Sequence, residues 1–530
     1  MSTAEYRRAG LGRVARGSAL NMGGAVAGAL VNLGIVVAVT RGFSADTAGV
    51  LFSATSVFLI ASAVANLGTS NGLVYFLARL RARGAGHAAP RVLRTALVPA
   101  VAASVLGGAA MFALADDLAA LVGEPQAEMY LRLLAAFLPF AVVTDAALAA
   151  TRAYHEMRAG VLLEKLGRPL GQLVLISAVA LTGGAGLLTV AWAGPYLPAA
   201  VLAWWWMHRI VARYRGDASG TSGGAAPVPA PPDSPAPARP RTAAGAGVEE
   251  ADPRTFWAFS LPRSVASIAQ LGIQRIGIVL VAALAGAAEA AVFTAATRFM
   301  VAGQFAAQAL QFAAEPRLAE MLAVDDRRGA NTLYRSGTAW LICLTWPIFL
   351  PAIVYAPLLM QLFGPRYTEG AVVLVVISLA QLLSAALGMG DLVLTMTGRT
   401  RLNLANNLLA LAADVALCLL LVPWTGATGA AAAWAGAIAV RKVLPLVQLM
   451  RSHGLHPFDR RWVLAAVSCL VWFGGVPLLC AFAVGTGPVS FAVALTAGSA
   501  GFLATLWRLR DPLELDGLLR RGTARGGGTD

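Results

Sequence analysis

Polar side chains recur along one face of an otherwise apolar stretch near the middle of the chain, residues 256–285. They follow the spacing i, i+4, i+7 and i+11, which places them on one side of a helix: Arg263, Ser267, Gln270 and Gln274. Arg275 lies next to this stripe, about 100° around the helix from Gln274. Guanidinium groups bind phosphate and pyrophosphate through paired donors, so these residue types indicate a site for an anionic ligand.

A second polar stripe lies in the next apolar stretch, residues 290–312, close to Arg298. Both stripes have counterparts 242 residues earlier: Asn32 matches Gln274, Ser62 matches Gln304 and Asn66 matches Gln308. The motif AWAG recurs at the same offset, at 191–194 and 433–436. Because the offset spans an even number of predicted membrane helices, the sequence predicts two parallel repeats related by an axis along the membrane normal.

A polar stripe on a membrane helix faces other helices or water, since facing lipid is costly. Taken singly, these residues fit hydrogen bonds between helices. Taken as a set at matching positions of two like halves, they predict one central cavity between the halves. The cavity set is Arg263, Arg275, Arg298, Gln270, Gln274, Gln304, Gln308, Asn32, Ser62 and Asn66. Arg263 could instead reach the inner interface and Arg298 a helix end, whereas Arg275 lies near the middle of its stretch.

Three acidic residues interrupt the apolar stretches. Asp145 and Asp391 each end a stretch and are followed within about two turns by Arg152 and Arg399, respectively. Asp414 lies inside a stretch. These groups fit a cytoplasmic gate of ion pairs, a cation-coupling site, or ordinary pairing at helix ends, which is the simplest interpretation.

The composition excludes a soluble chain. Of 530 residues, 58% are hydrophobic and 13% are charged, whereas soluble proteins carry about 25% charged residues. The net charge of +14 comes from arginines at the ends of apolar runs, which indicates contact with anionic lipid rather than nucleic acid. The four cysteines show no metal spacing, and neither an HExxH motif nor a GxxxxGK[ST] loop occurs. We expect no metal, no cofactor and no ATPase activity.

The apolar runs predict an all-α polytopic membrane protein, because each span needs about 20 apolar residues. About fourteen windows qualify: 18–40, 48–68, 95–115, 130–150, 161–183, 186–208, 256–285, 290–312, 335–359, 370–396, 402–423, 427–449, 462–483 and 488–507. Arginines gather in alternate loops, which places both termini in the cytoplasm.

The windows and the composition between them predict six segments. These are a basic tail 1–17, a six-helix bundle 18–212, a disordered linker 213–254, a second six-helix bundle 255–450, an extra helix pair 451–509 and a basic tail 510–530. The linker is assigned because it is rich in proline, alanine and glycine.

The segment from Leu362 to Gly436 resembles the polysaccharide-exporter branch of the multidrug/oligosaccharidyl-lipid/polysaccharide (MOP) transporter superfamily. The resemblance rests on an FG..Y turn at 363–367, a GR pair at 398–399 and the pattern L.P..G..GAA at 421–431. The strings TRGFSADTAGVLFSA and EPRLAEM, which follow the first and eighth windows, also fit. The resemblance covers residues 15–450, and the order and spacing of its motifs make it specific.

The resemblance implies a fold and a function. Members have two six-helix bundles in a V around a central cavity, and the polysaccharide members flip polyprenyl-pyrophosphate-linked sugars across the cytoplasmic membrane by alternating access. The lipid II flippases of peptidoglycan synthesis look similar and also have a final helix pair. Arg41 and Arg298 fall where members carry recurrent basic residues. No family acid maps onto a mid-helix position of the first bundle, which leaves coupling open.

We therefore expect a flippase of the plasma membrane, not an enzyme. Its expected partners are a lipid-linked oligosaccharide, which is a precursor of cell-surface polysaccharide or peptidoglycan, membrane lipids, and glycosyltransferases or a polymerase of the same pathway. A cation-coupled multidrug exporter of the same superfamily is the alternative. A polytopic glycosyltransferase or ligase is disfavoured because it needs a large outer loop, and the predicted outer loops are short.

Overall fold

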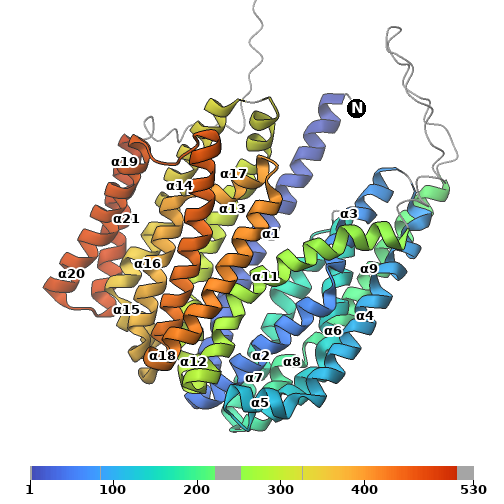
Figure 1. Cartoon of the computed structure of the whole chain (residues 1–530), viewed down its shortest axis with the longest axis horizontal. Coiled ribbons are helices and arrows are strands. Elements are labelled where there is room, and N and C mark those ends of the chain that lie inside the picture. The colour runs from blue at the N-terminus through green and yellow to red at the C-terminus, as the bar shows by residue number, and fades with distance from the viewer. Residues whose placement is uncertain (1–2, 84, 155, 221–251, 325, 510–530) are drawn as a thin grey trace, which may run out of the picture. The chain divides into compact units, whose positions relative to one another are not determined.

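The computed structural model describes residues 3–83, 85–154, 156–220, 252–324 and 326–509, and every regular element in these ranges is a helix (Figure 1). Helices are expected here because, in hydrocarbon, each backbone N–H and C=O must be bonded within its own segment. The all-α fold class is thereby confirmed. The chain divides into two compact units, Met1–Arg275 and Ile276–Asp530, and each has its own apolar core.

The first unit contains the helices up to the first part of α11. Their bounds are α1 Thr3–Gly42, α2 Ala45–Asn66, α3 Thr69–Ala82, η1 Gly86–Ala88, α4 Ala89–Ala113, α5 Ala115–Val122, α6 Ala127–Ala153, η2 Gly160–Gly167, α7 Arg168–Thr182, η3 Ala185–Leu187, α8 Leu188–Ala193, α9 Tyr196–Gly220 and α11 Pro253–Ala285. Most of the predicted N-terminal tail thus belongs to α1. The predicted linker overlaps α9 up to Gly220, and its remainder up to residue 251 lies outside the described residues.

The boundary between the units falls inside α11, at Arg275, rather than in the linker before residue 255. Two glycines explain why the first part of α11 packs with the first unit. A Cβ at Gly72 would come within 2.6 Å of the Phe256 ring, and one at Gly68 would meet the Ser260 carbonyl oxygen. Small residues four positions apart allow this close approach of two helices.

The second unit contains the remaining helices. Their bounds are α12 Ala287–Thr297, α13 Met300–Ala323, α14 Arg327–Val354, α15 Ala356–Met360, η4 Gln361–Phe363, η5 Pro365–Gly370, α16 Ala371–Leu387, α17 Gly390–Met396, α18 Thr400–His453, α19 Arg460–Cys469, η6 Leu470–Gly475, α20 Val476–Val484 and α21 Pro488–Arg508. The segments η2 and η6 are π-helical, and the other η segments are 3₁₀ helices.

The long helix α18 comprises two of the predicted spans, which meet at Gly426. This glycine has φ 56° and ψ −134°, so the helix direction changes there. Across the break, the Ala427 N–H donates to Glu289 Oε2 at 2.8 Å, and the carboxylate therefore caps the second half of α18. Farther along, the side-chain amides of Asn406 and Gln448 bond each other reciprocally at 2.8 and 3.0 Å.

Ten helical segments in the described ranges are long and apolar enough to cross a membrane. Three further predicted windows, 161–183, 186–208 and 290–312, fall on helices that are broken into shorter pieces. Each of the fourteen predicted windows therefore coincides with helical structure.

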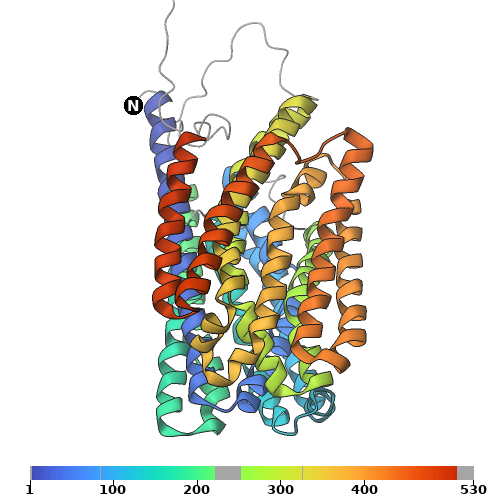
Figure 2. The same ribbon diagram turned by 90° about the vertical axis from the view of Figure 1, so that its left-hand side faces the viewer.

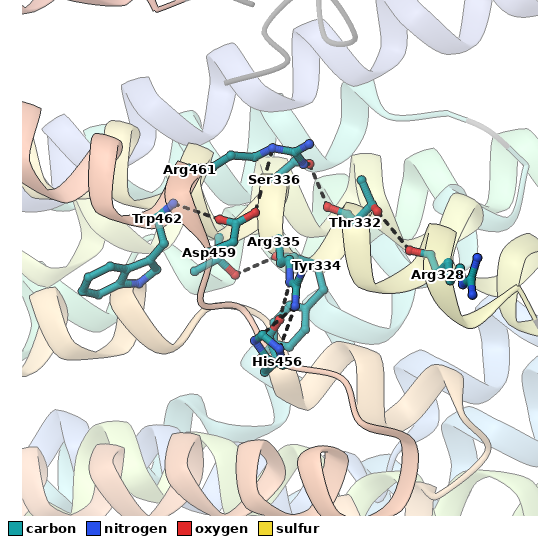
Figure 3. A network of polar contacts seen from close by, with 10 residues as sticks. Arg328, Thr332, Tyr334, Arg335, Ser336, His456, Asp459, Arg461 and Trp462 are labelled. Atoms are coloured by element: carbon teal, nitrogen blue, oxygen red, sulfur yellow. Dashed lines mark hydrogen bonds and ion pairs between the residues drawn. The ribbon is translucent and has the colours of Figure 1, made fainter. Parts of the chain in front are cut away.

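The final helices are attached to the rest of the second unit by polar contacts around the loop before α19 (Figure 3). Arg335 of α14 donates to His456 Nε2 at 2.7 Å, and Arg461 of α19 donates to Ser336 Oγ at 3.0 Å. Asp459 caps α19 by accepting from the Trp462 N–H at 3.1 Å. Beyond α19, the helices α20 and α21 pack side by side as the red pair of Figure 2. The expected windows 462–483 and 488–507 fall on the continuous span Arg460–Val484, which comprises α19, η6 and α20, and on α21.

Candidate functional site: an open polar face and charged clusters in the two units

The polar stripe of α11 lies on an open face of the helix. Arg263, Ser267, Gln270 and Gln274 are all exposed. Other residues of the helix are buried: Phe256, Ser260, Ser264, Ala269 and Ile273. The stripe is therefore open to its surroundings, since all four of its side chains are exposed. It presents amide and guanidinium groups outward on a helix that is long and apolar enough to cross a membrane, where contact with lipid alone would be costly.

Arg275 belongs to a charged cluster around Tyr196. Arg275 is half-buried, and Tyr196 is 2% exposed. The two side chains are close enough to interact electrostatically. The Arg168 guanidinium carbon lies 4.5 Å from the centroid of the Tyr196 ring, a cation–π contact. Asp145 and Glu164 lie within electrostatic range of the same ring. We name these five residues the Tyr196 cluster.

Sequence reasoning missed Arg168, a basic member of this cluster, and Lys165, which lies nearby in the sequence. Lys165 and Arg168 occur in the string EKLGR, where charges are spaced i, i+1 and i+4 at the start of a predicted span. That spacing puts Glu164 and Arg168 on one side of a helix, a signal that was available. Arg168 Nε is buried and has no hydrogen-bond partner among the described residues.

On α1, two predicted cavity residues are exposed. Asn32 is exposed, and its side-chain amide donates to the Gly28 carbonyl of the same helix at 2.8 Å. Arg41 is exposed in the last turn. Gly28 allows α1 to pack on η2, since a Cβ there would lie 2.6 Å from the Lys165 carbonyl oxygen. The contact brings α1 beside the segment that carries Glu164.

Two other predicted cavity residues are buried inside the first unit. Ser62 and Asn66 are 5% and 9% exposed. Asn66 spans the break between α2 and α3: its amide donates to Ser70 Oγ at 3.2 Å, and its oxygen accepts from the Ser70 N–H at 3.2 Å. Leu67 and Gly68 have left-handed backbone there, so Asn66 supplies local hydrogen bonds at a helix break. Periodicity places residues on one face of a helix but does not say whether that face is open.

In the second unit, Arg298 turns back onto its own helix. Its Nε donates to the Thr294 carbonyl at 3.2 Å, and one terminal nitrogen lies 3.4 Å from Thr297 Oγ1. On α13, Gln304 is half-buried and Gln308 is exposed. Because Arg298 belongs to the second unit and Arg263 and Arg275 to the first, a cavity shared by the three arginines remains a prediction.

Asp391 has basic partners other than the predicted one. Its carboxylate lies 3.3 Å from Lys442 Nζ and 3.6 Å from an Arg441 nitrogen, both on α18. Lys442 Nζ also donates to the Gly388 carbonyl at 3.2 Å. Arg399 is exposed. The expected pairing of Asp391 with Arg399 is replaced because α18 returns beside α17 and brings two cations to the carboxylate.

The other two acids differ from each other. Asp145 lies within electrostatic range of Glu164, Arg168 and the exposed Arg152. Asp414 is 1% exposed, and neither carboxylate oxygen has a hydrogen-bond partner among the described residues. A buried carboxyl without a partner is costly unless it is protonated or takes up a cation.

Among known proteins, no family model and no curated sequence matches this chain. Solved structures match its fold. A structure of the lipid II flippase MurJ, inward closed, has a TM-score of 0.69 at 11% identity and covers 94% of this chain and 99% of its own. An inward-facing multidrug resistance MATE family transporter has a TM-score of 0.60 at 16% identity, covering 81% and 94%. The MATE multidrug transporter DinF-BH has a TM-score of 0.56 at 15% identity, covering 84% and 97%.

At these identities the likeness concerns the fold. The neighbours are a flippase and multidrug transporters, and the inward-facing MATE family transporter belongs to the superfamily that the sequence resembles. The helices are long and apolar, which makes the chain a multi-pass membrane protein. It has the fold of the multidrug/oligosaccharidyl-lipid/polysaccharide transporter superfamily.

Proposed function

We propose that this protein flips a polyprenyl-pyrophosphate-linked oligosaccharide across the cytoplasmic membrane by alternating access, with both termini in the cytoplasm. The observation that carries the proposal is the open polar face of α11, where Arg263, Gln270 and Gln274 are exposed on a helix long and apolar enough to cross a membrane. The MOP fold and its MurJ and MATE neighbours support a transporter. The cargo would be a precursor of cell-surface polysaccharide or peptidoglycan, delivered by glycosyltransferases or taken up by a polymerase of the same pathway.

The Tyr196 cluster supplies the positive charge that a pyrophosphate site needs. Arg168 and Arg275 hold two positive charges beside one buried ring, with Asp145 and Glu164 in electrostatic range. A pyrophosphate that approaches such a cluster gains charge-assisted hydrogen bonds that a neutral drug does not. The carboxylates keep the cluster near neutrality when no anion is bound, which lowers the cost of holding the arginines inside the membrane.

A cation-coupled multidrug exporter is the second candidate, and Asp414 is the observation in its favour. A buried carboxyl without a hydrogen-bond partner suits binding and release of a proton or metal cation. Coupling at Asp414 is equally compatible with a flippase, since the driving ion is separate from the cargo. The cargo therefore decides between the candidates.

Depletion of the protein followed by lipid extraction tests the proposal. A flippase predicts that sugar-loaded polyprenyl carrier accumulates inside the cell, whereas an exporter predicts altered drug tolerance with a normal lipid pool. The combined variant Arg275→Ala, Arg298→Ala is expected to reproduce the accumulation. Arg213→Ala, an exposed change on α9, serves as the control. Normal glycan export by the double variant would exclude these two arginines from the cargo path.

A further inference from the structure

Four side chains on α3 and α11 form a continuous stack in the first unit. The rings of Tyr75 and Phe259 lie parallel, with centroids 4.1 Å apart and an angle of 19°. The Arg263 guanidinium carbon lies 3.9 Å from the Phe259 centroid. At the other end, Arg79 lies 5.3 Å from the Tyr75 centroid and donates to Tyr75 Oη at 2.7 Å. We call Arg79, Tyr75, Phe259 and Arg263 the α3–α11 stack.

Close packing beneath the stack fixes its geometry. Phe76 contacts both rings edge-on, at 5.1 Å from Tyr75 and 5.5 Å from Phe259. Phe76 is 2% exposed and Phe256, which packs against it, is 1% exposed. The glycines of α3 bring the two helices to this distance. The rings therefore rest on closely packed aromatic side chains, and the Arg263 guanidinium lies over the Phe259 ring.

The stack is exposed on its outer side. Tyr75 is 38% exposed, and Arg263 is exposed. No described residue forms an ion pair with Arg263. A guanidinium that lies over a ring keeps its N–H donors at its edge, where they point away from the π face. The stack thus presents an oriented cationic edge beside aromatic surface, a combination that suits an anion attached to an apolar or sugar group.

The position of the stack connects it to the polar stripe. Arg263 is the first member of the open face that continues through Gln270 to Gln274, a distance of about 16 Å along the helix axis. The arginine pattern places two helix termini near the stack at the cytoplasmic side: α3 ends at Ala82, three residues after Arg79, and α11 begins at Pro253, ten residues before Arg263. An anion held at Arg263 would have the amides of the stripe as its next hydrogen-bond donors.

We propose that the α3–α11 stack is the first docking site for the diphosphate of the lipid-linked cargo, before it moves along the α11 face. This rests on the proposed function. The shared chemistry is a diphosphate, which could come from the lipid carrier or from free pyrophosphate. Rigid stacking keeps the Arg263 donors oriented before the cargo arrives, so a lysine at this position would keep the charge but lose the flat, paired donors.

Binding to the purified full chain in nanodiscs of zwitterionic lipid tests this site, with polyprenyl diphosphate as the probe. We expect Arg263→Gln to weaken binding about tenfold, because a charge-assisted bidentate contact is lost. Arg263→Lys and Phe259→Leu should each weaken it by about three- to tenfold. The matched control is Arg254→Gln, the same charge change at an exposed position of the same helix, which should leave binding within about twofold.

The outcomes separate this proposal from the one it rests on. Failure of the wild-type protein to bind polyprenyl diphosphate would overturn the flippase proposal and the docking site together. Normal binding by Arg263→Gln and Phe259→Leu would overturn the docking site alone, as would an equal loss in Arg254→Gln. Inorganic pyrophosphate that competes at equal concentration would show that the polyprenyl chain adds nothing to binding, which would overturn a docking site specific for the lipid carrier. Thermal unfolding of each variant checks that it is folded. If Arg263→Gln does not fold, Arg263→Lys serves as the test variant instead.

Discussion

The Asp391 carboxylate lies 3.3 Å from the Lys442 ammonium, and the two side chains are only 13% and 12% exposed. Arg441 adds a second cation at 3.6 Å. The pair joins the short helix α17 to the second half of α18, just after the Gly388 backbone with φ 72°. Buried pairs of this kind contribute little net stability but become costly when one member is removed.

Asp391→Asn is therefore expected to destabilise the second unit by about 3–5 kcal/mol, because the buried Lys442 ammonium loses its counter-charge. The measurement is thermal unfolding of the purified protein in detergent. Asp391→Asn combined with Lys442→Met should recover most of the loss. Arg399→Gln, at an exposed position, should not change the unfolding midpoint, and a large effect there would restore the pairing expected from the sequence.

The break in α18 offers a second stability prediction. A Cβ at Gly426 would lie 2.5 Å from Glu289 Oε2, and φ 56° disfavours any side chain. Gly426→Ala should cost about 1–2 kcal/mol from the left-handed backbone alone, and more if Glu289 can no longer cap Ala427. Gly474→Ala is the matched control, since no atom lies within 4 Å of its Cβ position. Equal unfolding midpoints for the two variants would contradict the prediction.

The helices themselves could be predicted because an apolar run of about 20 residues has few alternatives to a membrane helix. The ion-pair partners of buried charges could not be predicted from the sequence. Asp391 and Lys442 are separated by 51 residues, and only the return of α18 beside α17 brings them together. Arg399 was the nearer cation in sequence, but it faces outward.

The polar stripe of α11 lies on an exposed face of that helix, whereas the same pattern on α2 lies on a buried face. Both stripes have helical periodicity, but Ser62 and Asn66 are buried by packing within the first unit. Arg168, which sequence reasoning missed, shows that contacts between different helices cannot be predicted from charge spacing alone. Its contact with Tyr196 joins residues 28 positions apart on different helices, and the charge spacing in EKLGR does not reveal that ring.

The contact between Arg168 and Tyr196 yields a functional prediction. Tyr196→Phe keeps the ring beneath the guanidinium and should retain transport. Tyr196→Leu removes the cation–π contact and should lower transport about three- to tenfold. The readout is sugar-loaded polyprenyl carrier that accumulates in cells, normalised to the amount of folded protein. The same transport with leucine as with phenylalanine would show that the ring only fills space.

Asp414 gives a prediction of opposite sign to that for Asp391, although the substitution is the same. Its carboxyl has no hydrogen-bond partner among the described residues and is 1% exposed, so Asp414→Asn removes a group that is costly to ionise in the membrane. The variant should unfold at a temperature no lower than the wild type. If the carboxyl takes up the driving cation, the same variant should lose transport that depends on a proton or sodium gradient. Transport by reconstituted vesicles under imposed gradients measures this. A variant that keeps the gradient dependence of the wild type would exclude Asp414 from coupling, because asparagine cannot exchange a proton and offers a cation no negative charge.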